Sequence, residues 1–572
     1  MPRNTCTSRE QSIKQVLYFG GQPAQFRALV DGLAAQSNHR LCASANSSSD
    51  GSPLICWNSK AHKGQVVRHL EREFVNLMVL DLRCAGDARD FARRKESILE
   101  ILSALDEMGD VEARYGFHRI LLLVSGSDSE QVDQAIVEVG LRGVGSVLRQ
   151  SFARSSDGTC PTDAAFAARV IARSEALIFA GHRGHRALCA AGGGITGIYF
   201  EMGALKCLDD CLATDAINSF DMYFGISAGA IVVGLLSAGY SVDELMAAVH
   251  GVKGMRLAPL DMRVFRLGHV DYPSLGGRLQ TAAKIAWKSF WGALRRPSVP
   301  SLDRLLFDYS DVVGPPFRAR GFGKVLESAL TAPGTINDFR LLPHKLYIGA
   351  TEQDAREHVL FGSEGHDEVP ISTAIEASMS LNPAFGSTPI QGHFYEDGAV
   401  TRTSNFSEAI RRGAGLVFTI DPFVPYVSRD RGFARDRGML YNIDQNIRTM
   451  SYTRFENTRS WILRQHPDVS SYTFVPANRL RRLLSISPFD HRPYLEIWRG
   501  AYLSTLQRVH RIAHRLQGDV KVHGLSFDTA LADAVAERLS ASKDVAFDDF
   551  FLDRKVRIKQ VPLKNTPARV CA

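Results

Sequence analysis

The chain has 572 residues, of which 45% are hydrophobic and 23% are charged, a composition typical of globular proteins with room for about two to four domains. The net charge of +7 comes from basic residues spread along the chain, so it does not indicate a nucleic-acid partner. Nine cysteines without a CxxC pair argue against a disulfide framework and a structural zinc site, and they favour a reducing cytoplasm. No apolar run approaches the roughly 20 residues that span a bilayer, and the polar N-terminus predicts no signal peptide, so any membrane contact is expected at the surface.

The first segment of the chain alternates apolar, β-branched runs with helical patterns. Such alternation is typical of a parallel sheet with helices on its faces. We therefore predict an α/β domain over residues 1–180. Strands are expected at 15–20, 75–83, 119–127 and 143–150, and helices at 25–35, 91–108 and 129–139.

This segment weakly resembles a response-regulator receiver domain, which has a flavodoxin-like fold. Asp81 ends a strand where a receiver has its phosphoacceptor, Ser125 ends the next strand, and Arg149 lies near the position of the receiver's lysine. The resemblance is incomplete, because YFGG stands where receivers have the acidic pair that holds Mg²⁺. We interpret the segment as a degenerate interaction or dimerisation module, with a working phosphoacceptor as the alternative.

Three consecutive glycines stand in CAAGGGITGIYF, between a predicted strand and a predicted helix. Gly192, Gly194 and Gly197 match the GxGxxG spacing of nucleotide-binding folds. A Rossmann fold, however, needs an acidic residue after the following strand, and here Asp221 precedes that strand. The lysine of a P-loop is also missing. The glycine turn alone is compatible with a phosphate site or with an oxyanion hole.

Ser227 lies in GISAG, flanked by Gly225 and Gly229, between a predicted strand and a predicted helix. In this context GxSxG is the nucleophile elbow, which presents a strained serine at the end of a strand. One helix connects the two glycine turns, so their strands are expected to be parallel and both turns to lie at one edge of the sheet. The amides of Gly193 and Gly194 can then face an oxyanion on a carbonyl that the serine attacks.

A serine nucleophile needs a base, and two arrangements compete. An α/β-hydrolase supplies an acid and then a histidine, but the histidines after residue 400 lie in helical or polar stretches. The stretch HFYEDGAV instead ends a predicted strand in Asp397, followed by Gly398, although Asp-Gly is also a common hairpin turn. The motifs thus offer a Ser–Asp dyad as the second arrangement.

Together these motifs resemble the patatin-like phospholipase family over roughly residues 187–424, and the stretches 347–362, 374–390 and 416–423 resemble it as well. The resemblance implies a three-layer α/β/α fold and lipid acyl hydrolase activity without a metal or a cofactor. It assigns the nucleophile to Ser227, the base to Asp397, the oxyanion hole to Gly192, Gly193, Gly194 and Gly197, and the elbow and turn to Gly225, Gly229 and Gly398.

Two positions depart from the family pattern. Thr196 stands where the family usually has Lys or Arg, and TRTSNF (401–406) replaces the usual asparagine and proline after the Asp-Gly turn. Loss of the basic residue is expected to weaken the hold on an anionic headgroup or the order of the loop. Because the serine, the aspartate and the glycines are kept, these departures bear on substrate and rate more than on the reaction class.

Two further segments have helical patterns. Residues 279–297 place Trp287 and Phe290 on one face and basic residues on the other, which indicates either an interfacial amphipathic helix or a core helix with a solvated basic face. Residues 493–516 repeat apolar side chains at three- and four-residue spacing, which predicts a core-facing helix.

These observations predict a receiver-like domain over 1–180, a patatin-like catalytic domain over 185–430, and a helical extension over 430–572 that packs on the catalytic domain. We expect a cytoplasmic serine lipid acyl hydrolase; the alternative is a regulatory or scaffold protein with a vestigial hydrolase domain. A lipid or ester substrate and peripheral membrane contact follow from the first interpretation, and no nucleic acid is expected. Contact with a second copy or a partner protein through the N-terminal domain stays open, as do the lipid and the acyl position cleaved.

Overall fold

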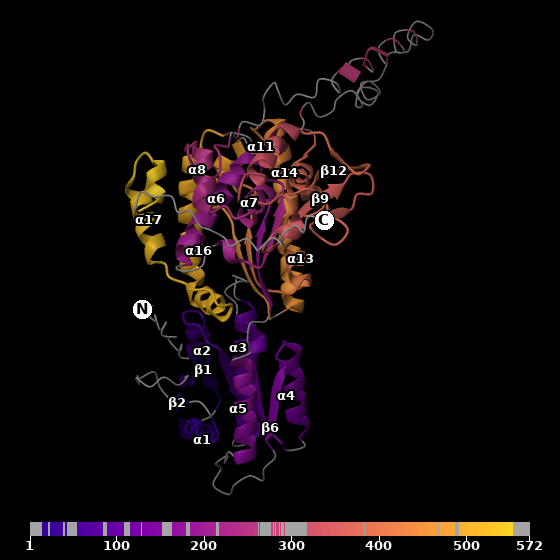
Figure 1. The fold of residues 1–572 in the computed structure, drawn as a ribbon. Helices are drawn as coiled ribbons and strands as arrows, with labels where there is room; N and C mark the ends of the chain where they lie inside the picture. The colour runs from indigo at the N-terminus through magenta and orange to yellow at the C-terminus, as the bar shows by residue number, and fades with distance from the viewer. Residues whose placement is uncertain are drawn as a thin grey trace, which may run out of the picture. The chain divides into compact units, whose positions relative to one another are not determined.

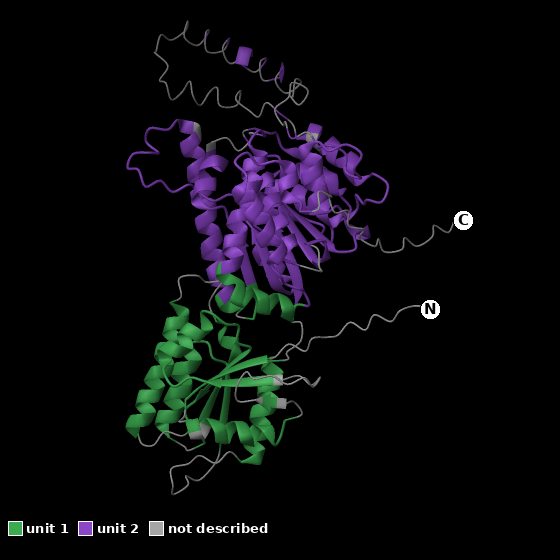
Figure 2. Cartoon of the chain, turned by 90° about the vertical axis from the view of Figure 1, so that its left-hand side faces the viewer, with its two compact units in different colours: residues 1–183, 464–470, 511–523 green, residues 184–463, 471–510, 524–572 purple. Residues whose placement is uncertain are grey.

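The computed structural model divides the chain into two compact units (Figure 2). Unit 1 comprises residues 1–183, 464–470 and 511–523, and unit 2 comprises residues 184–463, 471–510 and 524–572. The structure describes residues 14–20, 23–37, 40–42, 54–83, 88–107, 115–126, 129–150, 163–178, 184–212, 217–260, 262, 276–277, 280, 282–284, 287, 291, 317, 319–382, 384–466, 468–486 and 491–552.

Unit 1 contains a six-stranded, all-parallel sheet (Figure 1). The strand order is β2-β3-β1-β4-β5-β6. With the short edge strand β2 set aside, the order of the other five is the doubly wound 2-1-3-4-5 arrangement, with its switch point between β1 and β4. The strands are β1 (Lys14–Phe19), β2 (Arg40–Cys42), β3 (Leu54–Ser59), β4 (Leu77–Asp81), β5 (Ile120–Ser125) and β6 (Ser146–Gln150).

Helices cover both faces of this sheet and enclose two apolar cores. Helices α1 and α5 pack with one core, and α2, α3 and α4 pack with the other. The sequence patterns predicted α1, α3 and α4, but β3, α2 and α5 were not identified. The helices are α1 (Pro23–Ala34), α2 (Lys63–Leu70), α3 (Ala88–Asp106), η2 (Phe117–Arg119), α4 (Glu130–Leu141) and α5 (Ala164–Ile178).

Unit 2 is built on an eight-stranded mixed sheet in the order β11-β12-β9-β8-β7-β13-β14, with β10 paired to β9. Strands β13, β7, β8 and β9 are parallel, whereas β12 and β10 are antiparallel to β9. The strands are β7 (His185–Ala190), β8 (Met222–Ile226), β9 (Lys345–Glu352), β10 (His358–Phe361), β11 (Thr388–Ile390), β12 (His393–Asp397), β13 (Ala414–Ile420) and β14 (Ser470–Phe474).

Helix α6 is the central helix of unit 2. All residues from Ile195 to Cys211 are buried, because α7, α8 and α17 pack against it, and its Gly203 lies close to Trp498 of α16. A helix buried on every side needs no polar face. The helices are α6 (Gly194–Cys211), η3 (Ile217–Ser219), α7 (Ala228–Ser237), α8 (Val242–His250), α11 (Arg320–Leu330), η6 (Phe339–Leu341), α12 (Ile371–Ser378), η7 (Gly398–Val400), α13 (Phe406–Arg411), α14 (Met439–Gln465), α15 (Asn478–Ile486), α16 (Tyr494–Val522), α17 (Ala530–Ala541) and η8 (Phe547–Phe550).

The two helical patterns predicted outside the motifs have different outcomes in the structure. The core-facing helix predicted at 493–516 is confirmed by α16, although residues 511–523 belong to unit 1 and not to the extension expected on unit 2. Most of the amphipathic segment 279–297 lies outside the described residues. Cys56 is disulfide-bonded, a feature that the cysteine pattern did not predict. Within the described residues, no helix has the length and apolar character needed to cross a membrane.

Candidate active site

The glycine loop joins the end of β7 to the start of α6. Gly194, the first residue of α6, has a φ of 64°, in the left-handed region that favours glycine. A Cβ atom at Gly193 would lie 2.6 Å from Cγ of Pro422 and 2.9 Å from Cα of Gly197. The loop therefore needs glycine both for its backbone angles and for its close approach to Pro422.

Ser227 occupies the turn between β8 and α7 with φ 52° and ψ −118°, a strained conformation for a residue with a side chain. Its N–H donates to Oγ of Ser378 (2.8 Å), and the Ser378 hydroxyl donates to the carbonyl oxygen of Gly349 (2.6 Å). A Cβ atom at Gly229 would lie 2.3 Å from the carbonyl oxygen of Ala190, and one at Gly225 would lie 2.5 Å from Cα of Ala230. The two glycines thus give the elbow the close packing that it needs.

Asp397 ends β12, and strand β9 separates it from β8. The register places Ile226 opposite Gly349 on one side of β9, and Asp397 opposite Ala350 on the other. The aspartate and the residue after Ile226 therefore lie at the same level of the sheet. The Gly398 that follows needs its missing side chain, because a Cβ atom there would lie 2.3 Å from the carbonyl oxygen of Gly349.

The carboxylate of Asp397 is buried, with 1% exposure, and it interacts with the Ser227 side chain. Its Oδ1 also accepts from the N–H of Ala399 (2.8 Å). Burial raises the pKa of Asp397 to about 6, and the hydrogen bonds from Ser227 and Ala399 only partly oppose this increase. The side chain is thus a carboxylate above about pH 6 that lies beside the serine and has no ion pair among the described residues.

The glycine loop lies against both of these residues. A Cβ atom built on Gly192 would be 3.2 Å from Cβ and 3.8 Å from Oγ of Ser227, and 3.7 Å from Cβ of Ala399. The structure therefore brings the three motifs together. Gly197 has a different environment, because its N–H donates to the carbonyl oxygen of Gly193 (3.0 Å).

Residues 188–410 match the family described as patatin-like phospholipase. Over this segment, the chain is similar to patatin-like phospholipases. The resemblance predicted from the sequence motifs is confirmed, and the matched residues include the glycine loop, Ser227 and Asp397.

Other comparisons cover less of the chain or show weaker likeness. The cUMP-AMP-activated phospholipase of Escherichia coli is 40% identical over 62 residues, which make up 11% of this chain and 19% of that protein. The chain thus spans about a fifth of the length of this curated relative. Among solved structures, VipD from Legionella pneumophila aligns over 67% of this chain and 93% of its own, with 11% identity and a TM-score of 0.23. The type III effector protein ExoU aligns over 65% of this chain and 69% of its own, with 14% identity and a TM-score of 0.22.

The patatin-like domain carries a polar network that reaches the turn after Asp397 and that the motifs did not reveal. His358 is hydrogen-bonded through Nδ1 to the Thr401 hydroxyl (2.8 Å) and through Nε2 to Oδ1 of Asn405 (2.9 Å). Thr401 is hydrogen-bonded to Thr351 (2.9 Å), whose hydroxyl lies 3.0 Å from the carbonyl oxygen of Asp397. The residues that replace the family's asparagine and proline thus connect the turn to β9 and β10.

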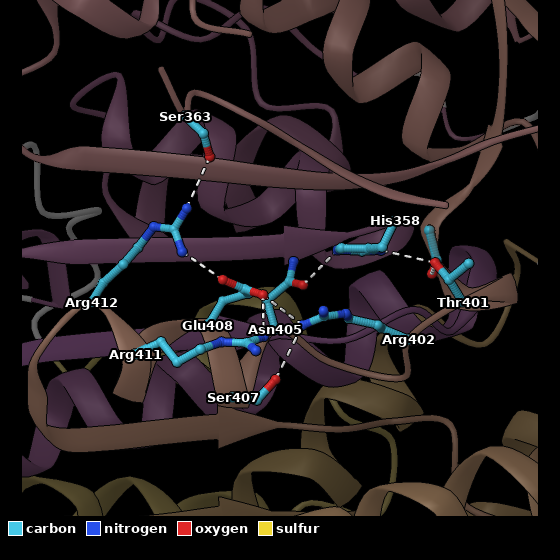
Figure 3. A network of polar contacts seen from close by, with 10 residues as sticks. His358, Ser363, Thr401, Arg402, Asn405, Ser407, Glu408, Arg411 and Arg412 are labelled. Atoms are coloured by element: carbon cyan, nitrogen blue, oxygen red, sulfur yellow. Dashed lines mark hydrogen bonds and ion pairs between the residues drawn. The ribbon is translucent and has the colours of Figure 1, made fainter. Parts of the chain in front are cut away.

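Figure 3 shows this network together with an adjoining ionic cluster. Glu408 of α13 is bound by the guanidinium groups of three arginines, Arg402, Arg411 and Arg412. Burial lowers the pKa of His358 to about 4, and Arg402 contributes in the same direction, so the imidazole is neutral at physiological pH. A neutral ring bonded at both nitrogens holds Thr401 in place without adding charge beside the dyad.

Behind the glycine loop, Pro422 is held by a residue of α14. Nη1 of Arg448 donates to the Pro422 carbonyl oxygen (3.3 Å), and its Nε donates to Oδ2 of Asp444 (2.8 Å). Arg448 is almost fully buried, so this contact forms a rigid backing for the loop. Sequence reasoning missed Arg448 because it lies outside the matched segment and has no motif of its own.

Thr196, the departure from the family pattern, is 1% exposed on the first turn of α6. Among the described residues its hydroxyl has no hydrogen-bond partner. The side chain at this position is therefore part of the packed interior and is not presented to solvent.

The candidate phosphoacceptor of unit 1 is engaged in an internal network. Asp81 is 2% exposed, and its carboxylate accepts from Nε (3.0 Å) and Nη2 (2.7 Å) of Arg83 and from the Tyr18 hydroxyl (2.9 Å). Arg83 also donates to Oε1 of Gln150 (2.6 Å). A carboxylate with both oxygens occupied in this way is a structural ion pair.

The two other receiver-like positions lie at neighbouring strand ends. Ser125 is the last residue of β5, and Arg149 of β6 is paired with Asp133 of α4. Arg149 is thus bonded away from Asp81 and toward the helix layer. The receiver-like interpretation of unit 1 stays a prediction.

Proposed function

We propose that this protein is a serine lipid acyl hydrolase that cleaves carboxylic ester bonds through a dyad of Ser227 and Asp397. The observation that supports this most strongly is that the Asp397 carboxylate is buried, interacts with the Ser227 side chain, and has no ion pair among the described residues. The match of residues 188–410 to the patatin-like phospholipase family supports a lipid ester as the substrate class. The proposed reaction needs no metal and no cofactor.

In the proposed reaction, Asp397 accepts the hydroxyl proton as Oγ of Ser227 attacks the ester carbonyl carbon. The carbonyl π electrons move onto oxygen and give a tetrahedral oxyanion. Collapse of this intermediate breaks the ester C–O bond, and Asp397 returns the proton to the departing alcohol. Water then attacks the acyl-enzyme, with Asp397 as base again, and the serine is restored as the acid product leaves.

We propose that the oxyanion is bound by the amides of the glycine loop. The first N–H groups of a helix have no intrahelical acceptor, and α6 begins at Gly194. We therefore assign the donors to Gly193 and Gly194, with Gly192 providing the room beside Ser227. Since the Gly197 amide is bonded to Gly193, we assign Gly197 to close packing against Pro422. The positive end of the α6 dipole adds to this stabilisation.

We also propose a domain organisation for the whole chain. We propose that residues 185–430 form the catalytic domain in a three-layer α/β/α arrangement, with residues 430–572 as a largely helical extension. For residues 1–180 we propose a receiver-like regulatory or interaction module that acts through a partner protein or a second copy of the chain. A cytoplasmic location with peripheral contact to a membrane fits a lipid substrate.

Fluorophosphonate labelling combined with ester hydrolysis tests the proposal. The wild-type protein should be labelled at one serine and hydrolyse short-chain and lipid esters, and Ser227→Ala should lose both properties. Ser378→Ala is a useful comparison, because Ser378 holds the elbow backbone but is not the proposed nucleophile. If Ser227→Ala were still labelled and active, the assignment would be wrong and a scaffold role for the domain would be favoured.

A further inference from the structure

Arg454 is a residue of α14, outside the segment that matches the family, and its side chain reaches the turn that follows Asp397. Its Nη1 donates to the carbonyl oxygen of Val400 (3.3 Å), and its Nη2 donates to the carbonyl oxygen of Ala399 (3.2 Å) and to Oγ1 of Thr403 (3.4 Å). The Thr403 hydroxyl donates in turn to the carbonyl oxygen of Ser451 on α14 (2.9 Å). Arg454 and Thr403 thus join α14 to the turn after Asp397.

All three acceptors of Arg454 are neutral. Arg454 has no ion pair with an acidic residue in the described part of the chain, unlike Arg448, which is paired with Asp444, and Arg402, which is paired with Glu408. Partial burial lowers the pKa of Arg454, and a guanidinium keeps its charge in proteins. The residue therefore brings an uncompensated positive charge to the rim of the candidate active site.

The guanidinium also has donors to spare. A guanidinium has five N–H donors, and within the described residues the three bonds above leave the Nε–H and one N–H of Nη1 without an acceptor. The side chain is exposed, so a ligand can approach it. Charged, directional donors of this kind bind phosphate oxygens strongly.

Arg454 is placed close to the dyad through Ala399. The N–H of Ala399 donates to the Asp397 carboxylate, its carbonyl accepts from Arg454, and its Cβ lies beside the Gly192 and Ser227 contact. One residue of the turn therefore separates the guanidinium from the reacting groups. In a glycerophospholipid, the phosphate is carried on the glycerol carbon next to the one that bears the central ester. The phosphate and this ester are therefore close together, as Arg454 and the dyad are.

We propose that Arg454 binds the phosphate of a phospholipid headgroup while the ester carbonyl lies at Ser227. The inference rests on the proposed function and deepens it, because it selects phosphate-bearing lipids over neutral glycerides. Thr196, which replaces the family's basic residue, is buried and uncharged, so the cation comes from α14 instead. The headgroup site is thus supplied by a helix outside the family-matched segment.

Equilibrium binding to Ser227→Ala protein tests this without turnover. Dihexanoyl phosphatidylcholine and dihexanoylglycerol, both monomeric, are titrated into Ser227→Ala, Ser227→Ala/Arg454→Gln and Ser227→Ala/Arg454→Lys. The ratio of the affinity for the phospholipid to the affinity for the glyceride should fall about tenfold with Arg454→Gln, as expected for loss of hydrogen bonds to a charged group. Arg454→Lys should keep part of the preference, because it keeps the charge but not the fork.

The control is Arg340→Gln in the same Ser227→Ala background. Arg340 is a half-exposed arginine that precedes the amino end of β9, away from the carboxyl ends of β7 and β8. It should leave the ratio unchanged. An unaltered ratio with Arg454→Gln would overturn the inference, whether both affinities fall together, as for a residue that only holds the turn, or neither changes.

Two further measurements separate the related conclusions. Inorganic phosphate is titrated into the same proteins. Binding of phosphate that Arg454→Gln abolishes would show that the site also accepts free phosphate. If phosphate does not bind but Arg454→Gln still removes the preference for the phospholipid, the site is specific for phosphate carried by a lipid. Hydrolysis of both lipids by the wild-type protein tests the proposed function on its own. Because binding is read without turnover, absent hydrolysis would refute the hydrolase and leave the headgroup result to be judged separately.

Discussion

Each unit of this protein places an aspartate at the carboxyl end of a strand, and the two aspartates have opposite surroundings. Asp81 ends β4 in unit 1 and accepts hydrogen bonds from Arg83 and Tyr18. Asp397 ends β12 in unit 2, and within the described part of the chain its carboxylate accepts from the neutral Ala399 amide and interacts with the neutral Ser227 side chain. Both carboxylates are almost fully buried, so the difference lies in their partners and not in their exposure.

The pKa values of the two groups move in opposite directions for this reason. Burial raises the pKa of both, but the charge and hydrogen bonds of Arg83 reverse the effect at Asp81 and hold its pKa below the usual value. Among the described residues, Asp397 has no ion pair that opposes the effect of burial, and its pKa rises to about 6. An aspartate at a strand end is suited to act as a base where no cation is paired with it. Where an arginine lies beside it, the aspartate forms a structural ion pair instead.

The largest expected contrast is in catalysis. Asp397→Asn keeps the shape and burial of the side chain but removes the base, and kcat for ester hydrolysis should fall about 1000-fold or more. Asp81→Asn, the same substitution at the other strand end, should leave kcat of the folded protein within about twofold. Steady-state kinetics on samples checked for folding by circular dichroism measure both, and similar losses in the two variants would erase the distinction.

The next contrast is in stability. Arg83→Met leaves the Asp81 carboxylate buried without its cation, and the free energy of unfolding of unit 1 should fall by about 3–5 kcal/mol. Because the folded pKa of Asp81 lies below its unfolded value near 4, the stability that this pair contributes is present above about pH 4 and is lost as the pH falls. Urea unfolding at several pH values tests this. A free energy of unfolding that does not change as the pH falls would contradict it.

The same linkage has the opposite sign at Asp397. Its folded pKa of about 6 exceeds the unfolded value near 4, so ionisation weakens the fold, and stability is lost as the pH rises through this interval. Asp397→Asn should therefore be more stable than the wild-type protein at pH 7.5, by on the order of 1–3 kcal/mol, and no more stable near pH 4. If the variant is less stable than the wild-type protein at pH 7.5, burial of the ionised Asp397 carboxylate does not destabilise the folded protein.

The smallest effect is expected from the network that supports the Asp397 turn. His358→Ala removes the hydrogen bonds to Thr401 and Asn405, and the looser turn should lower kcat about three- to tenfold. The matched control is His366→Ala, an exposed histidine on the loop after β10. Equal kcat in the two variants would show that the network does not position the turn.

The features that the sequence predicted are those encoded in short turns. GGG and GISAG each place glycine where a Cβ atom would collide, and Asp397–Gly398 is a turn of the same kind, so local chemistry alone indicated all three positions. The sheet edge that gathers them followed from the βαβ connection. Their roles in catalysis stay proposals.

The features that were missed depend on contacts between distant parts of the chain. Ser378, Arg448 and Arg454 act through backbone carbonyls or amides far away in sequence, and no motif marks such partners. Asp81 was identified as a strand-end acid, but only the folded arrangement shows that Arg83, two residues later, turns back to neutralise it. Charge pairing inside the fold therefore distinguishes two similar aspartates, and it is Asp397, without an ion pair among the described residues, that we propose as the base.

The most direct measurement of the central claim is the pH dependence of fluorophosphonate labelling at Ser227 in the wild-type protein and in Asp397→Asn. If Asp397 is the base, the wild-type labelling rate should rise with a midpoint near pH 6, since the carboxylate must be ionised to accept the serine proton. In Asp397→Asn the rate should be low at every pH and show no such midpoint. Labelling of the variant at the wild-type rate, or with the same midpoint, would contradict the assignment of Asp397.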